Sequence, residues 1–345
     1  MTLRFLLAPM AELSHRALRE LIENFGGCDE YFTEMISAGG LLGGGPFEKW
    51  YLDNGPRPEK LVYQLASGNA DQIVRAVALL EPYECAGIDL NMGCSAPAIT
   101  RTGAGVRWMA SIDKAGDLIR RLRPQTRRRL SVKLRIGLED DFDYLAAFCR
   151  RLETEGVEFI TLHPRSAREK FRGTCRWDYV GRLREALTIP VAGNGDIADA
   201  ADLLRRAAGP CDAVMAGRAA VRQPWIFAQA RKTANTDPVD LEETGLRFLE
   251  LLTRYQPPEF HLSRARLFFA YFCLNLKWGT YLKNLLNREE GLAGIERVWR
   301  GYFAEHGEER YLKMSFTSIS RPGSTETGTI SGTCSFSGVS GSLMP

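Results

Sequence analysis

The sequence predicts a parallel (β/α)8 TIM barrel followed by a small all-α domain. Two observations lead to this fold class. Short apolar segments of strand length alternate with amphipathic segments of helix length from the N-terminus to about residue 230. Eight strand–helix units fit within these residues, and eight is the number that closes a parallel barrel. A doubly wound open sheet is the alternative, but such a sheet rarely needs eight units.

The expected strands are short apolar runs that end at polar or glycine-containing turns. In chain order they cover residues 4–9, 30–35, 60–65, 87–91, 130–136, 159–163, 189–192 and 213–216. Between them, apolar residues at helical spacing predict helices near 15–25, 70–81, 112–122, 142–155, 178–187 and 198–207. The glycine-rich segment 39–45, followed by Pro46, predicts a long loop with partial helix after the second strand.

The pattern changes near residue 230. Thr236, Asp237 and Pro238 interrupt the chain, and residues 241–313 then have helical periodicity with no further strand signal. The last residues are rich in Ser, Thr and Gly and have no usable periodicity. We therefore expect a catalytic barrel over 1–235, a helical domain over 236–314 and a disordered tail over 315–345.

Composition sets limits on function. Of 345 residues, 25% are charged and 45% are hydrophobic, as in ordinary soluble enzymes, and the net charge of +3 is too small to indicate nucleic-acid binding by itself. The eight cysteines include no C-x-x-C pair, which argues against a zinc site or a disulfide framework. Neither a signal peptide nor a membrane-spanning segment is evident. We expect a monomeric cytoplasmic protein without a metal.

Chemically distinctive residues lie in the expected strands or directly after them, and we expect them at the barrel face where active sites lie. In chain order they are Pro9, Met10, Gln64, Asn91, Cys94, Lys133, His163, Arg165, Asn194, Gly195, Asp196, Gly217 and Arg218. Each has a structural alternative: a cysteine is often a small buried hydrophobe, and a strand lysine often belongs to an ion pair. Their coincidence at seven strand ends favours one catalytic site.

The residues after the last two strands suit a phosphate. Gly195 and Gly217 allow a close approach of the backbone to an anion, and Arg218 supplies positive charge. A phosphate-bearing cofactor surrounded by a lysine, a glutamine and a histidine suggests flavin mononucleotide (FMN). Lys133 is the candidate cation for stabilising the anionic reduced flavin.

Several motifs, taken together, resemble the tRNA-dihydrouridine synthases. They are Asn91-Met92-Gly93-Cys94-x-Ala-Pro, Val132-Lys133-Leu134-Arg135-x-Gly, His163-x-Arg165, Asn194-Gly195-Asp196-Ile197 and Gly217-Arg218-Ala219-Ala220. The resemblance covers about residues 3–230, and the helical region is similar in kind to that family's tRNA-binding domain. Ser14, Ser95 and Pro164 depart from the family's usual residues without removing a catalytic group.

The resemblance implies reduction of the uracil C5–C6 bond in tRNA. Hydride would pass from N5 of reduced FMN to C6, Cys94 would protonate C5, and NADPH or NADH would supply electrons. The base must leave its stack to react. Asn91 would hold the uracil, and Arg165 would lie near the flavin phosphate or the substrate. The residues that would line the flavin are Pro9, Met10, Ala11, Gln64, Lys133, His163, Asn194, Gly195, Asp196, Gly217 and Arg218.

Basic residues near the expected site are candidates for RNA contact. They are Arg101 in the cysteine loop, and Arg168, Lys170 and Arg172 after the sixth strand. In the helical region, Arg264, Arg266, Lys277 and Lys283 are further candidates for RNA contact. They alternate with aromatic residues, most of which we expect in the core. The arginine cluster over residues 120–129 precedes the fifth strand, so we expect it on the opposite face of the barrel.

Two alternatives remain open at the level of sequence. One is a flavin-dependent reductase or dehydrogenase of a free pyrimidine, similar to the dihydroorotate dehydrogenases. The other is a non-catalytic RNA-binding protein on a degenerate barrel. The helical domain and the basic loop over 168–172 favour a macromolecular substrate over a free pyrimidine.

Overall fold

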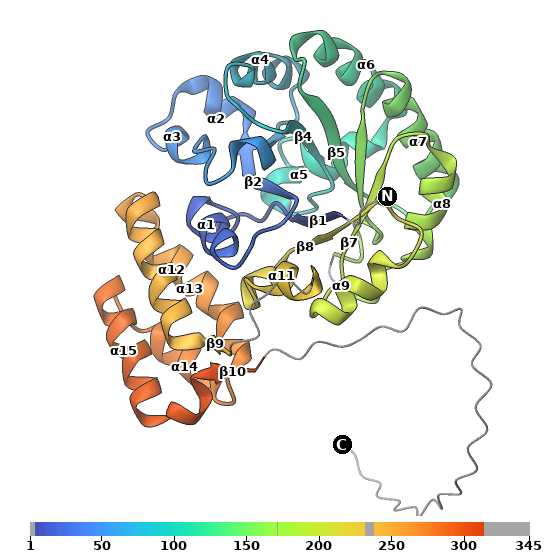
Figure 1. Cartoon of the computed structure of the whole chain (residues 1–345). Coiled ribbons are helices and arrows are strands. Elements are labelled where there is room, and N and C mark those ends of the chain that lie inside the picture. The colour runs from blue at the N-terminus through green and yellow to red at the C-terminus, as the bar shows by residue number, and fades with distance from the viewer. Residues whose placement is uncertain (1–3, 171, 232–237, 314–345) are drawn as a thin grey trace, which may run out of the picture. The chain divides into compact units, whose positions relative to one another are not determined.

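A computed structural model describes residues 4–170, 172–231 and 238–313. Its centre is a closed parallel barrel in which β1 to β8 are neighbours in chain order, and β8 pairs with β1 (Figure 1). The strands are β1 (Arg4–Leu7), β2 (Glu30–Ser37), β3 (Leu61–Ala66), β4 (Gly87–Met92), β5 (Arg129–Arg135), β6 (Phe159–His163), β7 (Val191–Asn194) and β8 (Ala213–Ala216). The predicted TIM barrel is confirmed.

Helices connect successive strands and surround the barrel (Figure 1). They are α1 (Arg16–Asn24), α4 (Ala70–Leu80), α6 (Ile112–Leu122), α7 (Phe142–Thr154), α8 (Asp178–Ala186) and α9 (Ala200–Ala207). Short helices α2 (Ala38–Gly43), α3 (Glu48–Tyr51), α5 (Pro97–Thr100), α10 (Arg218–Arg222) and α11 (Ile226–Arg231) occupy connections after strands. Asn69, Ser111, Asp141 and Asp199 cap α4, α6, α7 and α9 with side-chain oxygens, which explains where these helices begin.

Predicted strand ends are correct to within one or two residues in most cases. β1 ends at Leu7 rather than residue 9, since Pro9 has no N–H to continue the ladder. β2 runs to Ser37, two residues beyond its predicted end, and its register shifts between Phe32 and Met35. After the shift, Met35, Ile36 and Ser37 pair with Gln64, Leu65 and Ala66 of β3.

The arginines that precede and begin β5 lie on the N-terminal face, where they are largely paired. Arg123 bonds Glu158 at 2.7 Å, and Arg129 bonds Glu30 at 2.6 Å. Arg120 pairs with Asp117, and Arg121 pairs with Asp71. These pairs agree with a structural rather than an RNA-binding interpretation of this cluster.

The remaining described helices pack together around aromatic side chains. They are α12 (Leu241–Tyr255), α13 (Pro258–Phe272), α14 (Gly279–Leu286) and α15 (Leu292–Glu305). Phe248 of α12 stacks on Phe268 of α13, and Phe269 contacts Trp299 of α15. Phe268, Phe269 and Phe272 are buried, Tyr271 is partly buried, and Trp278 and Tyr281 are exposed, so half of the interleaved aromatics are fully buried rather than most of them. Arg264, one of the predicted RNA contacts, is buried and pairs with Glu34, so that prediction is wrong for this residue.

The prediction of no further strand after residue 230 is wrong in one detail. Val239–Asp240 (β9) and Tyr311–Leu312 (β10) form a two-stranded antiparallel sheet. Two-residue strands carry no periodicity, so this pairing had no sequence signal. Arg310 bonds Asp240 at 2.7 Å beside the pair.

The helical region contacts the barrel through α12 on α1 and α13 on α10. Residues 1–315 form one compact unit, so the division into a barrel and a helical domain stays a prediction. The predicted boundary at 235 and the disordered tail lie outside the described residues. Among the described helices, none combines the length and the apolar character that crossing a bilayer requires.

Candidate active site

A cavity of about 480 Å³ lies at the carboxyl ends of the barrel strands. This volume is within the range of small-molecule and cofactor sites. Every strand supplies part of its wall, either from its last residues or from the turn that follows. The predicted residues that line it are Pro9, Met10, Ala11, Gln64, Asn91, Cys94, Lys133, His163, Lys170, Asn194, Gly195, Asp196, Gly217 and Arg218.

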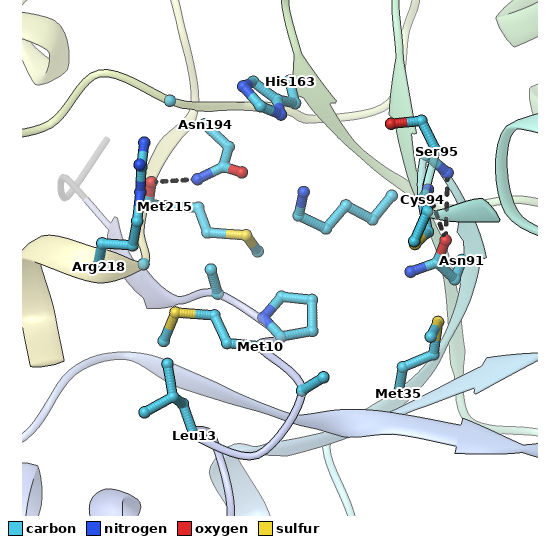
Figure 2. Close-up of a pocket in the computed structure, with 18 of the residues that line it drawn as sticks. Met10, Leu13, Met35, Asn91, Cys94, Ser95, His163, Asn194, Met215 and Arg218 are labelled. Carbon is cyan, nitrogen blue, oxygen red and sulfur yellow. Dashed lines mark hydrogen bonds between the residues drawn. The ribbon is translucent and has the colours of Figure 1, made fainter. Parts of the chain in front are cut away.

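Asn91 and Cys94 lie side by side on one wall of the cavity (Figure 2). Asn91 is the penultimate residue of β4, and its Oδ1 accepts hydrogen bonds from the backbone N–H of Cys94 at 2.9 Å and of Gly93 at 3.3 Å. The carbonyl of Cys94 accepts from Val106 N at 3.0 Å. The cysteine is thus held at both ends of its peptide unit, and it is partly exposed.

Gln64 extends this wall from the neighbouring strand. Its Oε1 accepts from Nδ2 of Asn91 at 3.0 Å. The side chains of Gln64 and Asn91 are therefore joined by a hydrogen bond, and Asn91 in turn holds the backbone of Cys94, whose thiol lies on the same wall.

The opposite wall carries Asn194, Met215 and Arg218 (Figure 2). Nδ2 of Asn194 donates to the Met215 carbonyl at 2.8 Å, which joins the ends of β7 and β8. Gly195 follows with φ +121°, and a Cβ there would lie 2.5 Å from Sγ of Cys175. Only glycine fits this conformation and this space, and Gly195 itself lines the cavity.

Arg165 lies behind this wall and holds the lining residue Asp196. Arg165 is buried and does not line the cavity. Its Nη2 donates to both carboxylate oxygens of Asp196, at 2.8 and 2.9 Å, and its Nε donates to the Arg172 carbonyl at 3.1 Å. Burial alone would raise the pKa of Asp196, but the Cys175 N–H and Arg165 bonds lower it below its usual value. Arg165 therefore contacts the loop and Asp196 rather than the cavity.

The cavity has an excess of positive charge. Lys133, Arg135, Lys170 and Arg218 line it, and the only lining carboxylate among the described residues is Asp196, which Arg165 neutralises. Burial, together with Arg135, lowers the pKa of Lys133 to about 8. This distribution suits a ligand with an anionic group.

His163 is neutral in this environment. Burial and the neighbouring Lys133, Arg135 and Arg165 lower the pKa of His163 to about 2. The imidazole can therefore offer one donor and one acceptor, but it carries no charge at physiological pH.

The four basic residues proposed for RNA contact near the expected site are in different positions. Lys170 lines the cavity, and it is exposed. Arg101, Arg168 and Arg172 are exposed and do not line the cavity. Arg101 donates to the carbonyl of the lining residue Pro97 at 3.2 Å, so it lies beside the cavity wall. Arg168 pairs with Glu139.

Several lining residues were not assigned to the site from the sequence, among them Leu13, Met35, Met215, Leu267 and Tyr271. Met35 lies near the end of β2, and Leu267 and Tyr271 come from α13. Met35 had a usable signal, because it ends the strand predicted over residues 30–35. Leu267 and Tyr271 had none, since their position depends on how α13 packs against the barrel.

Backbone strain is concentrated around the cavity. Three described non-glycine residues have positive φ: Glu12 at 60°, Lys170 at 54° and Asp196 at 52°. Lys170 and Asp196 line the cavity, and Glu12 follows the lining residue Ala11. Such conformations cost on the order of 1–3 kcal/mol each and are typical of functional sites.

The donor set fits FMN. One wall places the backbone of Gly195 and Gly217 and the guanidinium of Arg218 along the cavity, and backbone N–H groups with a cation are what a phosphate requires. The other offers the amides of Gln64 and Asn91, as the edge of a flavin or pyrimidine ring requires. Met10, Leu13, Met35 and Met215 supply apolar surface between these walls (Figure 2).

Comparison with known proteins gives one family. A family model described as "Dihydrouridine synthase (Dus)" matches residues 6–322. The chain is 31% identical over 264 residues to a "Probable tRNA-dihydrouridine synthase" of Aquifex aeolicus, covering 74% of this chain and 81% of the relative. It is 30% identical over 249 residues to a "tRNA-dihydrouridine(16) synthase" of Ralstonia nicotianae, covering 69% of this chain and 76% of the relative.

Among solved structures, a 2-naphthoyl-CoA reductase complex aligns with a TM-score of 0.50 and 10% identity. The alignment covers 68% of this chain and 50% of that one. At this identity the likeness concerns the fold alone.

Proposed function

This chain belongs to the dihydrouridine synthase family, and we propose that it reduces the C5–C6 double bond of uridine in tRNA. The observation that carries the proposal is the arrangement of the cavity. A thiol with two amides forms one wall, and open backbone with a cation forms the other (Figure 2). A flavin phosphate fits the second wall, and a pyrimidine fits beside the first.

The residues that line the cavity would hold FMN. When bound, FMN would supply the hydride for the reduction, and NADPH or NADH would reduce it again. The backbone at Gly195 and Gly217, with Arg218, would hold the phosphate, and Lys133 and Gln64 would serve the polar edge of the ring. The other residues assigned to the flavin are Pro9, Met10, Ala11, His163, Asn194 and Asp196. Arg165 has a supporting role, because it holds Asp196 and the loop after β6.

Cys94 is the proton donor. Its backbone is fixed by Asn91 and Val106, which aligns the thiol with one face of a bound uracil. Asn91 keeps a second N–H for the base, since only one of its two Nδ2 protons is needed for Gln64. Delivery of a proton by a positioned side chain typically contributes about 10²–10⁴-fold to the rate.

The substrate is tRNA rather than a free base. Lys170 at the cavity and Arg101, Arg168 and Arg172 outside it provide cations for the phosphates around a base that has left its stack. The helical region adds exposed Trp278 and Tyr281.

The test uses the FMN-loaded protein with NADPH and unmodified tRNA, and counts dihydrouridine after digestion of the RNA. The proposal predicts formation of dihydrouridine at one or a few positions, and no turnover of free uracil, uridine or dihydroorotate. Turnover of a free pyrimidine without action on tRNA would favour the dihydroorotate dehydrogenase-like alternative. A protein that binds tRNA but no flavin would favour the non-catalytic one.

A further inference from the structure

A buried carboxylate, Asp89, lies next to the cavity wall that carries Cys94 but outside the lining. Its relative exposure is 0%. On β4 it lies two residues before Asn91, so both side chains project from the same face of the strand. Asp89 is in register with Gln64 of β3 on one side and with Ser131 of β5 on the other.

Asp89 determines how the amide of Gln64 is oriented. Nε2 of Gln64 donates to Oδ2 of Asp89 at 2.8 Å, and Oγ of Ser131 donates to Oδ1 at 2.6 Å. An ionised carboxylate can only accept, so Gln64 must turn its NH₂ group toward Asp89. Its carbonyl oxygen then faces Asn91, where it accepts from Nδ2 at 3.0 Å.

These hydrogen bonds form a row from Asp89 through Gln64 and Asn91 to Cys94, and the Cys94 end of the row requires the same orientation of the two amides. The backbone N–H groups of Gly93 and Cys94 can only donate, so Asn91 must turn Oδ1 toward them, as it does at 3.3 and 2.9 Å. Every hydrogen bond from Cys94 through Asn91 and Gln64 therefore points toward Asp89. Bonds aligned in this way polarise and strengthen one another in a buried setting.

Asp89 is ionised at neutral pH, as this role requires. Burial raises its pKa to about 6, and the hydrogen bonds from Ser131 and Gln64 oppose that rise. A neutral side chain of the same shape would remove the constraint. Gln64 could then turn over, its NH₂ group would meet the NH₂ group of Asn91, and Asn91 would lose its hold on the turn that carries Cys94.

We propose that Asp89 is a positioning residue that, through Gln64 and Asn91, fixes the backbone of Cys94 against the cavity. The hydrogen-bonded row and its effect on the turn stand on geometry alone. The effect on the reaction rests on the proposed function, in which Cys94 delivers the proton.

The test compares Asp89→Asn with Ser131→Ala in the FMN-loaded, full-length protein. Asp89→Asn keeps the shape and removes the charge that orders the amides. Ser131→Ala removes the other hydrogen bond of the same carboxylate. Because that bond lowers the pKa of Asp89, both variants are measured at pH 8, where Asp89 stays ionised and the order of Gln64 and Asn91 is kept. Two quantities are measured for each: hydrogen exchange of the Gly93 and Cys94 amides, and single-turnover reoxidation of the reduced flavin by unmodified tRNA.

In Asp89→Asn we expect amide exchange about tenfold faster, which corresponds to loss of one hydrogen bond. We expect reoxidation by tRNA to be roughly tenfold to a hundredfold slower, as for a misplaced catalytic group. Reduction by NADPH, which does not use Cys94, should change far less. Ser131→Ala should leave both quantities near wild type.

Unchanged exchange and reoxidation in a folded Asp89→Asn protein would overturn the inference. If Asp89→Asn does not fold, Gln64→Leu removes the link between Asp89 and Asn91 and keeps the Asp89–Ser131 hydrogen bond. Unchanged exchange of the Cys94 amide in Gln64→Leu would also overturn the inference. If the wild type itself is not reoxidised by tRNA, the proposed function fails, and amide exchange still decides the positioning role.

Discussion

The buried ion pair between Glu34 of β2 and Arg264 of α13 joins the barrel to the helical region. The two side chains are 6% and 2% exposed, and Nη2 of Arg264 lies 3.0 Å from Oε2 of Glu34. Glu34 also accepts from the backbone N–H of Glu12 at 2.7 Å, next to the lining residue Ala11. Loss of the cation would leave a buried carboxylate without its charge partner.

We predict that Arg264→Met lowers the free energy of unfolding by about 3–5 kcal/mol near pH 8. Methionine preserves most of the apolar contact with Phe260, over whose ring the guanidinium lies at 4.6 Å, so the charge is the main change. The pKa of Glu34 is already raised by burial, with Arg264 opposing the rise, and it will rise further in the variant. A carboxyl whose pKa is higher in the folded than in the unfolded state stabilises less as pH increases. The decrease in the free energy of unfolding caused by Arg264→Met should therefore be smaller at pH 5 than at pH 8, by up to about 1.4 kcal/mol per pH unit.

The assay is urea unfolding followed by circular dichroism at both pH values. Glu34→Gln combined with Arg264→Met should recover part of the loss, because no buried charge remains unpaired. Arg297→Met removes an exposed cation that pairs with Glu289 and should change stability by less than about 0.5 kcal/mol. A loss of under about 1 kcal/mol at pH 8 for Arg264→Met, or an equal loss at both pH values, would refute the reasoning.

Three further predictions concern the cavity and its surroundings. Gly195→Ala places a Cβ 2.5 Å from Sγ of Cys175 at a residue with φ +121°, so the affinity for FMN, measured by fluorescence titration, should fall. In the control Gly43→Ala the added Cβ meets nothing within 4 Å, so this variant should bind FMN as the wild type does. The pKa of Lys133 is lowered to about 8, by burial first, so its charge is present below that pH and lost above it. In the wild type, flavin reduction by NADPH, followed by flavin absorbance, should become slower as the pH rises from 7 to 9. In Lys133→Met it should be slow at both pH values. A wild-type rate in the variant would exclude Lys133 as the stabilising cation. Lys170→Ala should weaken tRNA binding and reduce the slope of log K against log salt by about 0.7–0.9, the value for one phosphate contact, and an unchanged slope would remove Lys170 from the interface.

The barrel could be predicted because its signals are local. Each strand is a short apolar run with a polar end, and residues as far apart as Met10, Lys133 and Arg218 could be assigned to one site from strand ends alone. Parallel strands bring their carboxyl ends to one face whatever the lengths of the connections. The cavity gathers all of these positions.

What could not be predicted depends on contacts between distant segments. Leu267 and Tyr271 reach the cavity only because α13 packs against the barrel, partly through the Glu34–Arg264 pair. Arg165 is at the expected strand end, but its partner Asp196 holds it behind the wall. Asp89 reads as one polar residue in an apolar strand, and its relation to Gln64 becomes visible only from the register of β3 and β4.

Reduction of uridine in tRNA, with Cys94 as the proton donor, is tested most directly by single-turnover reoxidation of the reduced, FMN-loaded protein by unmodified tRNA, in wild type and in Cys94→Ala. Reoxidation should be fast in the wild type and about 10²–10⁴-fold slower in the variant, with FMN binding and reduction by NADPH preserved. Equal rates in both proteins would contradict the role of Cys94, and a wild-type flavin that tRNA does not reoxidise would contradict the substrate.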